Sequence, residues 1–314
     1  MPARALKLPM AVTSPQTERV VAEGGNKMNK FTEDVRAMVE ASTGKEVVID
    51  EVAKVNEIKT AISIRDGNLG ANFYIEDFYE DGMSAEYCAN MIVEAYENCP
   101  KLGFDVENYD FSFEAIKDKL IARLVGIERN KKLLESVAYK DMGCGLAIVP
   151  AIVPVIEPNG EFLVNVSKTL AEHYGYDVDK LVDTALVNDA NNKPAALMNL
   201  MGAVFGVTQN IFEMEDPSGA VGDGMLVLTN EETVMGASVI FHKGVLDKTR
   251  KIIGDDFYVL PSSIHEVIIV PDHAGNTAEE LKAIVNGANR NVVDEKDILS
   301  DDVYFFNGEL RKVA

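Results

Sequence analysis

The stretch FYVLPSSIHEVIIVPD, residues 257–272, decides the fold class because it predicts two strands joined by a polar turn. Residues 257–260 and 266–270 are rich in β-branched and aromatic residues, which is typical of strands. Pro261, Ser262 and Ser263 between them favour a turn, because their backbones and hydroxyls suit tight connections. If the two strands pair as a hairpin, the polar residues of the connection gather near its two ends.

Outward from this stretch, strand-like and helix-like segments alternate irregularly along the chain. Strand patterns occur at residues 46–55, 58–65, 70–75, 146–156, 161–167, 225–229 and 236–241. Helical spacing of apolar residues occurs at 31–42, 84–96, 130–137, 169–174, 179–186, 195–205, 245–253 and 277–285, and 113–125 carries both signals. We expect an α+β protein with two packed subdomains, each a mostly antiparallel sheet covered by helices.

The domain organisation follows from shifts in composition. Residues 1–27 hold four basic and two acidic residues, whereas the rest of the chain is strongly acidic. They predict a disordered N-terminal tail, with Met28 as the natural start of the protein or the tail as an unstructured extension. We place an N-terminal α+β subdomain at residues 28–141 and a C-terminal α+β subdomain at 142–314.

Composition excludes several classes of function. The formal net charge of −21 repels phosphate backbones and anionic lipid surfaces, so nucleic-acid binding is not expected. No stretch reaches the ~18 apolar residues of a membrane-spanning helix, so no membrane association is expected. Cys88, Cys99 and Cys144 fit neither a disulfide framework nor a zinc site. These features favour the cytoplasm.

The best candidate for chemistry is the polar group around the predicted turn. It comprises Ser262, Ser263, His265, Glu266 and Asp272. A hydrolase-like enzyme would need a serine within hydrogen-bond reach of His265 and a carboxylate that orients the imidazole. Successive strand side chains point to opposite faces, so His265 and Glu266 are not expected to converge, and Asp272 or a distant carboxylate would be the orienting acid.

The alternative is that these residues serve the geometry of the turn. In that interpretation Pro261 and the two serines connect the strands while His265 binds backbone groups. A zincin site is not supported, because position 269 is Ile where the His-Glu-x-x-His motif needs a second histidine. We favour the structural interpretation and expect neither a metal nor a cofactor.

Other polar motifs are weaker. The glycine cluster at 219–224 precedes a predicted strand, whereas phosphate loops lead into a helix, so we interpret it as a flexible loop. Acidic clusters at 76–81 and 294–302 lack EF-hand spacing and predict solvated surface rather than a Ca²⁺ or Mg²⁺ site. Cys144 has no basic neighbour in sequence that would lower the pKa of its thiol.

Several segments together carry a family resemblance. They are the hairpin stretch itself, VLTNEETVMGASVIFHKGVLDKTRKIIG before it, HYGYDVDKLVDTAL, the LAIVP strand and the final LSDDVYFFNGEL. Across residues 28–312 the chain resembles an uncharacterised bacterial (Firmicutes) family, domain-of-unknown-function family 5688. The resemblance implies a cytoplasmic protein and supplies no catalytic residue. Where relatives tend to show Asn-Thr-Pro, this chain has NDANNKP at 188–194.

The sequence therefore supports two functional hypotheses of different classes. The leading one is a binding or regulatory protein without catalysis that acts through a protein partner, because no complete catalytic motif is present. The alternative is a hydrolase-like enzyme that uses His265 with Ser262 or Ser263. A third interpretation, a role in defence or antidefence, rests on association with mobile elements in the family it resembles and assigns no residue.

Overall fold

A computed structural model describes residues 26–66, 69–98, 109–154, 156–157, 160–161, 163–206, 209–221, 224–261 and 263–314. Residues 1–25 of the predicted tail lie outside these ranges, and the first helix begins at Asn26. The chain divides into two compact units, residues 1–110 with 157–160 and residues 111–156 with 161–314. The predicted α+β class is confirmed, because the strand pairs of the three larger sheets are antiparallel and helices pack on the sheets.

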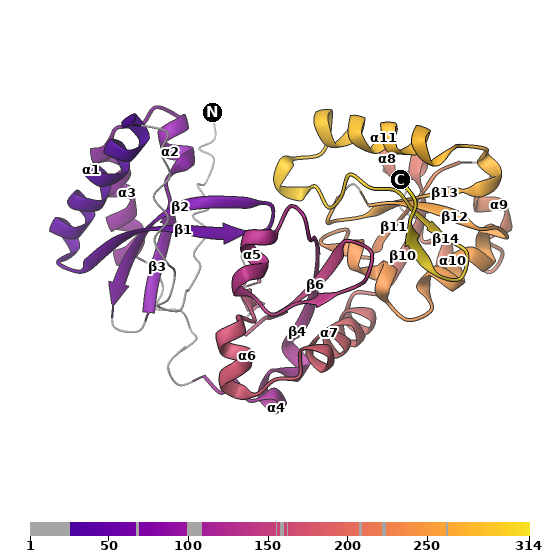
Figure 1. Ribbon diagram of the computed structural model, residues 1–314, viewed down its shortest axis with the longest axis horizontal. Coiled ribbons are helices and arrows are strands. Elements are labelled where there is room, and N and C mark those ends of the chain that lie inside the picture. The colour runs from indigo at the N-terminus through magenta and orange to yellow at the C-terminus, as the bar shows by residue number, and fades with distance from the viewer. Residues whose placement is uncertain are drawn as a thin grey trace. The chain divides into compact units, whose positions relative to one another are not determined.

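The first unit is a three-stranded meander with helices on one face (Figure 1). Its elements are α1 (Asn26–Thr43), β1 (Glu46–Lys54), β2 (Glu57–Asp66), β3 (Leu69–Tyr74), α2 (Glu76–Glu80) and α3 (Ala85–Glu97). The register runs from Glu46 opposite Arg65 to Ala61 opposite Tyr74, which confirms the strands predicted at 46–55, 58–65 and 70–75. Ser84 caps α3, since its Oγ accepts the Tyr87 N–H at 3.1 Å.

The core of this unit forms because helical and strand periodicities place apolar residues on facing surfaces. Val35 and Val39 of α1 and Ile92 of α3 are fully buried against Ile62 and Phe73 of the sheet. The opposite face of the sheet carries a buried polar pair, in which the Ser63 hydroxyl donates to Asn72 Oδ1 at 2.7 Å. Pairing satisfies these groups, which would otherwise be costly to bury.

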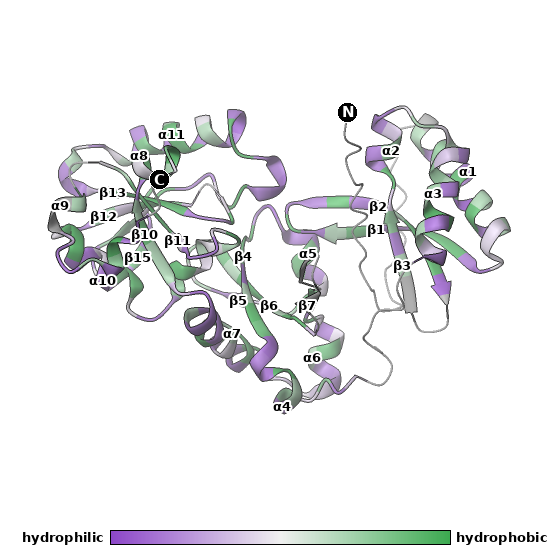
Figure 2. Ribbon diagram, turned by 180° about the vertical axis from the view of Figure 1, so that it is seen from behind, coloured by the Kyte–Doolittle hydropathy of each residue, from purple (hydrophilic) through white to green (hydrophobic). Residues whose placement is uncertain are grey.

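The second unit contains two larger sheets. The smaller one orders its strands β4 (Leu120–Gly126), β6 (Leu146–Ile152) and β5 (Lys140–Asp141), with β9 (Val164–Asn165) also paired to β6. Both long strands consist mostly of hydrophobic residues (Figure 2). The segments 146–156 and 161–167, both predicted as strands, pair with each other at only two positions, since β6 pairs mainly with β4.

Helix α7 (Val178–Asn192) closes the outer edge of β4. The Asn188 side chain donates to Leu120 O at 2.9 Å, and Asp189 Oδ2 accepts the Ala122 N–H at 2.9 Å. These contacts satisfy backbone groups that an edge strand would otherwise leave unpaired. The segment at which this chain departs from the family pattern therefore has a structural role.

The larger sheet has six strands in the order β10–β11–β13–β12–β14–β15. Their bounds are β10 Ala195–Asn199, β11 Leu226–Asn230, β12 Phe257–Leu260, β13 Val267–Pro271, β14 Tyr304–Phe306 and β15 Leu310–Lys312. Helix α11 (Ala278–Asn291) covers one face (Figure 1), with Leu281 and Val285 buried against Leu260 and Val270. The two strands predicted within residues 257–270 are confirmed and pair as a hairpin, with Phe257 opposite Pro271.

The remaining elements are short and lie between the strands and helices already described. They are α4 (Phe113–Ile116), η1 (Lys117–Lys119), α5 (Lys131–Ser136), β7 (Ile156–Glu157), β8 (Gly160–Glu161), α6 (Lys168–Tyr174), α8 (Leu200–Val204), η2 (Ile211–Glu213), α9 (Ser218–Val221), η3 (Gly236–Phe241), α10 (Val245–Ile253), η4 (Asp272–Ala274) and η5 (Glu295–Asp297). The residues between 113 and 125, which carried mixed signals, form a helical turn followed by β4.

Two predicted elements were wrong. Residues 195–205, predicted as one helix, form strand β10 and then α8. Residues 195–199 pair residue by residue with β11, and Asn199 Oδ1 then caps α8 by accepting the Gly202 N–H. Residues 236–241, predicted as a strand, form the 3₁₀ helix η3. Here the Gly236 and Ala237 N–H groups donate to the carbonyls of His265 and Ile264, which turns the chain inward.

The first unit ends at Asp110, whereas the sequence suggested a division after residue 141. The difference arises from strand pairing: β4 forms its ladder with β6, from Leu120 opposite Ile152 to Gly126 opposite Leu146. Residues 120–126 therefore share a sheet with residues that follow 142.

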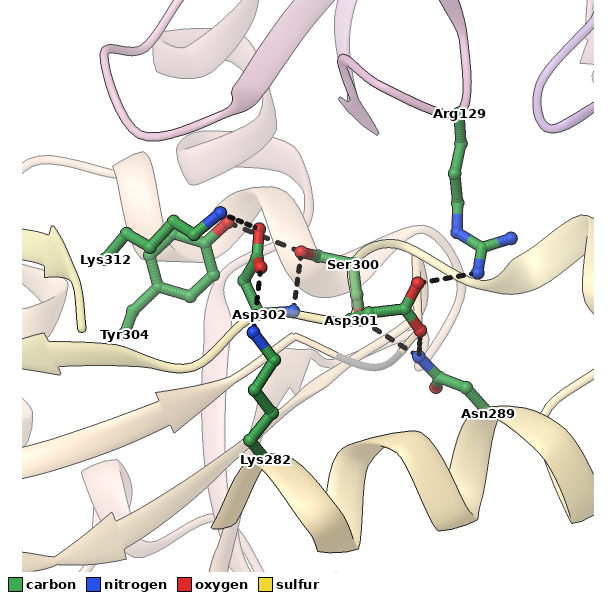
Figure 3. Close-up of polar contacts among 8 residues, drawn as sticks. All are labelled: Arg129, Lys282, Asn289, Ser300, Asp301, Asp302, Tyr304 and Lys312. Atoms are coloured by element: carbon green, nitrogen blue, oxygen red, sulfur yellow. Dashed lines mark hydrogen bonds and ion pairs between the residues drawn. The ribbon is translucent and has the colours of Figure 1, made fainter. Parts of the chain in front are cut away.

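Asp301 and Asp302 of the acidic segment 294–302 link the loop after β4, helix α11 and strand β15 (Figure 3). Asp301 accepts from Arg129 Nη2 and from Asn289 Nδ2, both at 2.8 Å. Asp302 lies 2.8 Å from Lys312 Nζ and 3.8 Å from Lys282 Nζ. The segment was predicted as solvated surface, but these two carboxylates hold cations from β15, α11 and the loop after β4.

Gly236 provides a direct test of the packing around η3. A Cβ at this position would lie 2.2 Å from Thr229 Oγ1, 2.6 Å from Asn230 N and 2.7 Å from His265 O. We expect Gly236→Ala to lower the free energy of unfolding by about 3 kcal/mol, because two of these atoms are backbone and cannot move aside cheaply. Urea denaturation monitored by circular dichroism measures the change.

Gly287→Ala in α11 is the matched control, since a Cβ there meets nothing within 4 Å. It should stabilise the protein by up to about 1 kcal/mol through helix propensity. Equal effects of the two substitutions would contradict the packing argument.

Candidate functional site

The structure places the predicted site residues in two separate regions. Ser263, His265 and Glu266 lie in the connection between β12 and β13. Asp272 begins η4 at the opposite end of β13, so it does not approach His265. Ser262 lies outside the described residues. Of the residues sought for a hydrolase, the structure thus brings together one serine, the histidine and one of the two carboxylates.

The His265 imidazole contacts a backbone amide and a carboxylate. Its Nδ1 accepts the Met235 N–H at 3.1 Å, and its Nε2 lies 3.5 Å from Asp297 Oδ1. Met235 has a positive φ of 51°, which is uncommon for a residue with a side chain. The imidazole therefore holds the loop after β11 in an unusual backbone conformation.

The His265 main chain is bound as closely as the ring. Its carbonyl accepts the Thr229 hydroxyl at 2.7 Å and the Gly236 N–H at 2.9 Å. Its N–H donates to Ser263 Oγ at 3.0 Å. Ser263 is only 4% exposed, so this hydroxyl faces protein rather than solvent.

Glu266 completes the cluster. Burial raises the pKa of its carboxyl, although His265 and a hydrogen bond with Ser263 act in the opposite direction. A catalytic triad requires one imidazole nitrogen to accept the serine proton while the other faces an acid. Here Nδ1 accepts from Met235, and the Ser263 hydroxyl contacts His265 N and Glu266. The arrangement is that of a braced turn.

Asp272 belongs to a different neighbourhood. Its N–H donates to Asp256 O at 2.9 Å. Burial raises the pKa of Tyr258, and the negative charge of Asp272 adds to that increase. Beside it, His273 Nδ1 lies 3.1 Å from Asp255 Oδ2.

Sequence reasoning missed a groove at the edge of the larger sheet. It encloses about 670 Å³ beside β10, and its described lining residues are Ala196, Met198, Gln209, Asn210, Glu213, Met214, Asn230, Glu231 and Thr233. They come from three separate segments, so no local motif marks them. This volume lies within the range of small-ligand pockets.

Helix α8 and its C-cap residue Phe205, together called the α8 cluster, expose large apolar side chains between two of the segments that line this groove. Met201, Val204 and Phe205 are 59%, 68% and 76% exposed. Single exposed apolar residues are ordinary on protein surfaces, but three within five positions form a cluster of the kind that marks interaction surfaces.

The cysteines and the first acidic cluster, the other candidates from the sequence, are buried or make local hydrogen bonds where they are described. Cys88 and Cys144 are free and buried; burial raises the pKa of Cys88 to about 12 and also raises the pKa of Cys144. Cys99 lies outside the described residues, as do residues 222 and 223 of the glycine cluster. Glu76 of the first acidic cluster accepts the Thr60 N–H.

The described ranges contain neither a metal-binding cluster nor a membrane-spanning helix. They contain no group of three or more His, Cys, Asp or Glu residues that could hold a metal ion. None of their helices combines the length and apolarity needed to cross a bilayer.

The fold and these sites define an α+β protein whose polar hairpin residues brace a turn and whose largest sheet has a groove at its edge. The chain belongs to the family of unknown function DUF5688, whose model matches residues 28–308. The family resemblance seen in the sequence is thereby confirmed. No curated protein and no solved structure matches the chain.

The bracing role of His265 predicts a pattern of substitutions. We expect His265→Ala to lower the free energy of unfolding by about 1–2 kcal/mol, because the Met235 N–H loses its acceptor. His265→Asn should recover part of that loss, since Asn Oδ1 occupies nearly the position of Nδ1. Chemical denaturation of both variants measures this, and an equal loss in the two would argue against the role.

His242 predicts acid sensitivity. It is 5% exposed, neither ring nitrogen has a partner in the described part of the structure, and burial lowers its pKa from 6.5 to about 4. Between these values the unfolded chain binds more protons, so stability should fall as pH drops from 6.5 to 4, by about 3 kcal/mol in total.

The His242→Phe variant isolates this contribution, because it keeps an aromatic ring that cannot be protonated. The wild-type free energy of unfolding minus that of the variant should rise with pH across the window and level off above it. A difference that does not change with pH would refute the assignment.

Proposed function

We propose that this chain is a bacterial cytoplasmic protein that binds a protein partner and does not catalyse a reaction. The observation that carries the proposal is the exposed apolar cluster of α8, Met201, Val204 and Phe205. Keeping such side chains in water is unfavourable, and a partner that covers them gains hydrophobic free energy.

The polar residues of the hairpin support the same proposal. The His265 imidazole and the Ser263 hydroxyl are engaged in local contacts that stabilise the turn. The net charge of −21 disfavours nucleic acid and anionic lipid as the partner. The buried free thiols of Cys88 and Cys144 are compatible with a reducing compartment.

The proposal predicts that binding depends on α8. We expect Val204→Ser combined with Phe205→Ser to remove a specific partner when the tagged protein is isolated from its native host and bound proteins are quantified by mass spectrometry. Val187→Ser with Val292→Ser is the matched control, because Val187 of α7 is 58% exposed and Val292, the residue that follows α11, is 82% exposed. Binding of the purified partner, with the same dependence on α8, then confirms the interaction.

Two results would overturn the proposal. One is a partner set that is identical for wild type and the α8 variant. The other is turnover of a substrate in a general hydrolase screen that His265→Ala abolishes while the protein stays folded.

A further inference from the structure

The groove beside β10 has a one-sided charge. Its described lining contains two carboxylates, Glu213 and Glu231, and no lysine, arginine or histidine. Both glutamates are exposed, and neither side chain makes a hydrogen bond or ion pair with another described residue. The site therefore repels anions and attracts cations.

Cations close to the groove in sequence already have partners. Lys248 Nζ donates to Phe212 O at 3.3 Å and lies 4.4 Å from the centre of the Phe212 ring. Lys193 Nζ lies 2.9 Å from Glu232. Within the described residues, Glu213 and Glu231 are thus left without a cation from the chain itself.

The amide groups of the groove hold its walls in place. Asn210 Oδ1 accepts the N–H groups of Leu197 and Phe212, both at 3.1 Å, which fixes the 210–213 turn against the edge of β10. Asn230 exchanges two hydrogen bonds with Val234, at 2.9 and 3.3 Å. Because the Leu197 N–H already donates to Asn210, it is not free to pair with an added strand. A ligand in the groove would therefore be bound mainly by side chains.

The apolar part of the lining suits an aliphatic chain. Ala196 and Met198 are 4% and 5% exposed, and Met214 is half-buried beside them. Thioethers are flexible and polarisable and pack well against aliphatic carbon. Lysine and arginine combine an aliphatic stem with a cationic head, which matches this division of the lining.

We propose that this groove binds a lysine- or arginine-containing segment of a protein partner, with the cationic heads beside Glu213 and Glu231 and the aliphatic stems on Met198 and Met214. The inference rests on the proposed function and adds the chemistry of the partner. The apolar cluster of α8, which lies between Met198 and Gln209 in sequence, would contact residues that flank the basic segment.

The test uses the full chain and two short capped peptides, one of alternating lysine and alanine and one of alternating glutamate and alanine. Binding is followed by methyl NMR of the 12 methionines at about 0.15 M salt, which screens long-range attraction. We expect the lysine peptide to shift the Met198 and Met214 methyl signals and the glutamate peptide to leave them unchanged.

Charge variants separate the groove from the acidity of the whole molecule. Glu213→Gln with Glu231→Gln should weaken binding of the lysine peptide about tenfold. Glu172→Gln with Glu309→Gln changes the net charge equally at two exposed sites outside the groove and should leave the affinity unchanged.

Three outcomes would overturn the inference: no shift at Met198 and Met214, equal shifts with both peptides, or equal weakening by the two pairs of substitutions. Each leaves the proposed function intact if the α8 variant still loses its partner. Conversely, a groove that binds the lysine peptide while the α8 variant keeps every partner would sink the proposed function alone.

Discussion

The hydrogen bonds of His265 hold together the ends of several segments in the second unit. Its carbonyl accepts from both Thr229 and Gly236, while the imidazole of the same residue binds the Met235 amide. One residue of the β12–β13 connection thereby fixes the end of β11 and the start of η3. Buried backbone groups need such partners, so the polar residues of this turn are explained by the fold before any chemistry is invoked.

Charge has a second organising effect in the same unit. Asp301 and Asp302 hold Arg129, Lys282 and Lys312, so part of the acidic excess is balanced inside the molecule. The glutamates of the groove lack such partners among the described residues. The distinction between neutralised and free carboxylates, rather than the total charge, is what separates a structural cluster from a candidate binding surface.

The sequence predicted those parts of the fold that local pattern controls. Strands β1–β3 interleave polar with apolar residues, and the β12–β13 hairpin consists of two short apolar runs on either side of a polar turn; the strands predicted in both places are confirmed. Strand β10 was missed because Ala, Leu and Met favour helices, and pairing with β11 overrides that preference. The strand-like residues of η3 were misassigned because the constraint is the space at Gly236, which only the folded structure reveals.

The candidate sites were harder to predict for a related reason. Ser263, His265 and Glu266 are neighbours in sequence, so their proximity was foreseeable, but Met235 and Asp297, which contact the imidazole, come from other segments. The groove likewise combines residues near 196, 210 and 231. No spacing rule links such positions, and only the strand order of the larger sheet brings them together.

The side chains that cap strand β4 have a consequence for self-association. An uncovered strand edge is a template on which a second copy can add, and runs as apolar as Leu120–Gly126 are prone to polymerise in that way. The side chains of Asn188 and Asp189 hydrogen-bond to outward-facing backbone groups of this strand, so α7 blocks the addition of another strand at this edge. Two polar residues on one helix thus take up backbone groups that a second copy would need in order to add a strand.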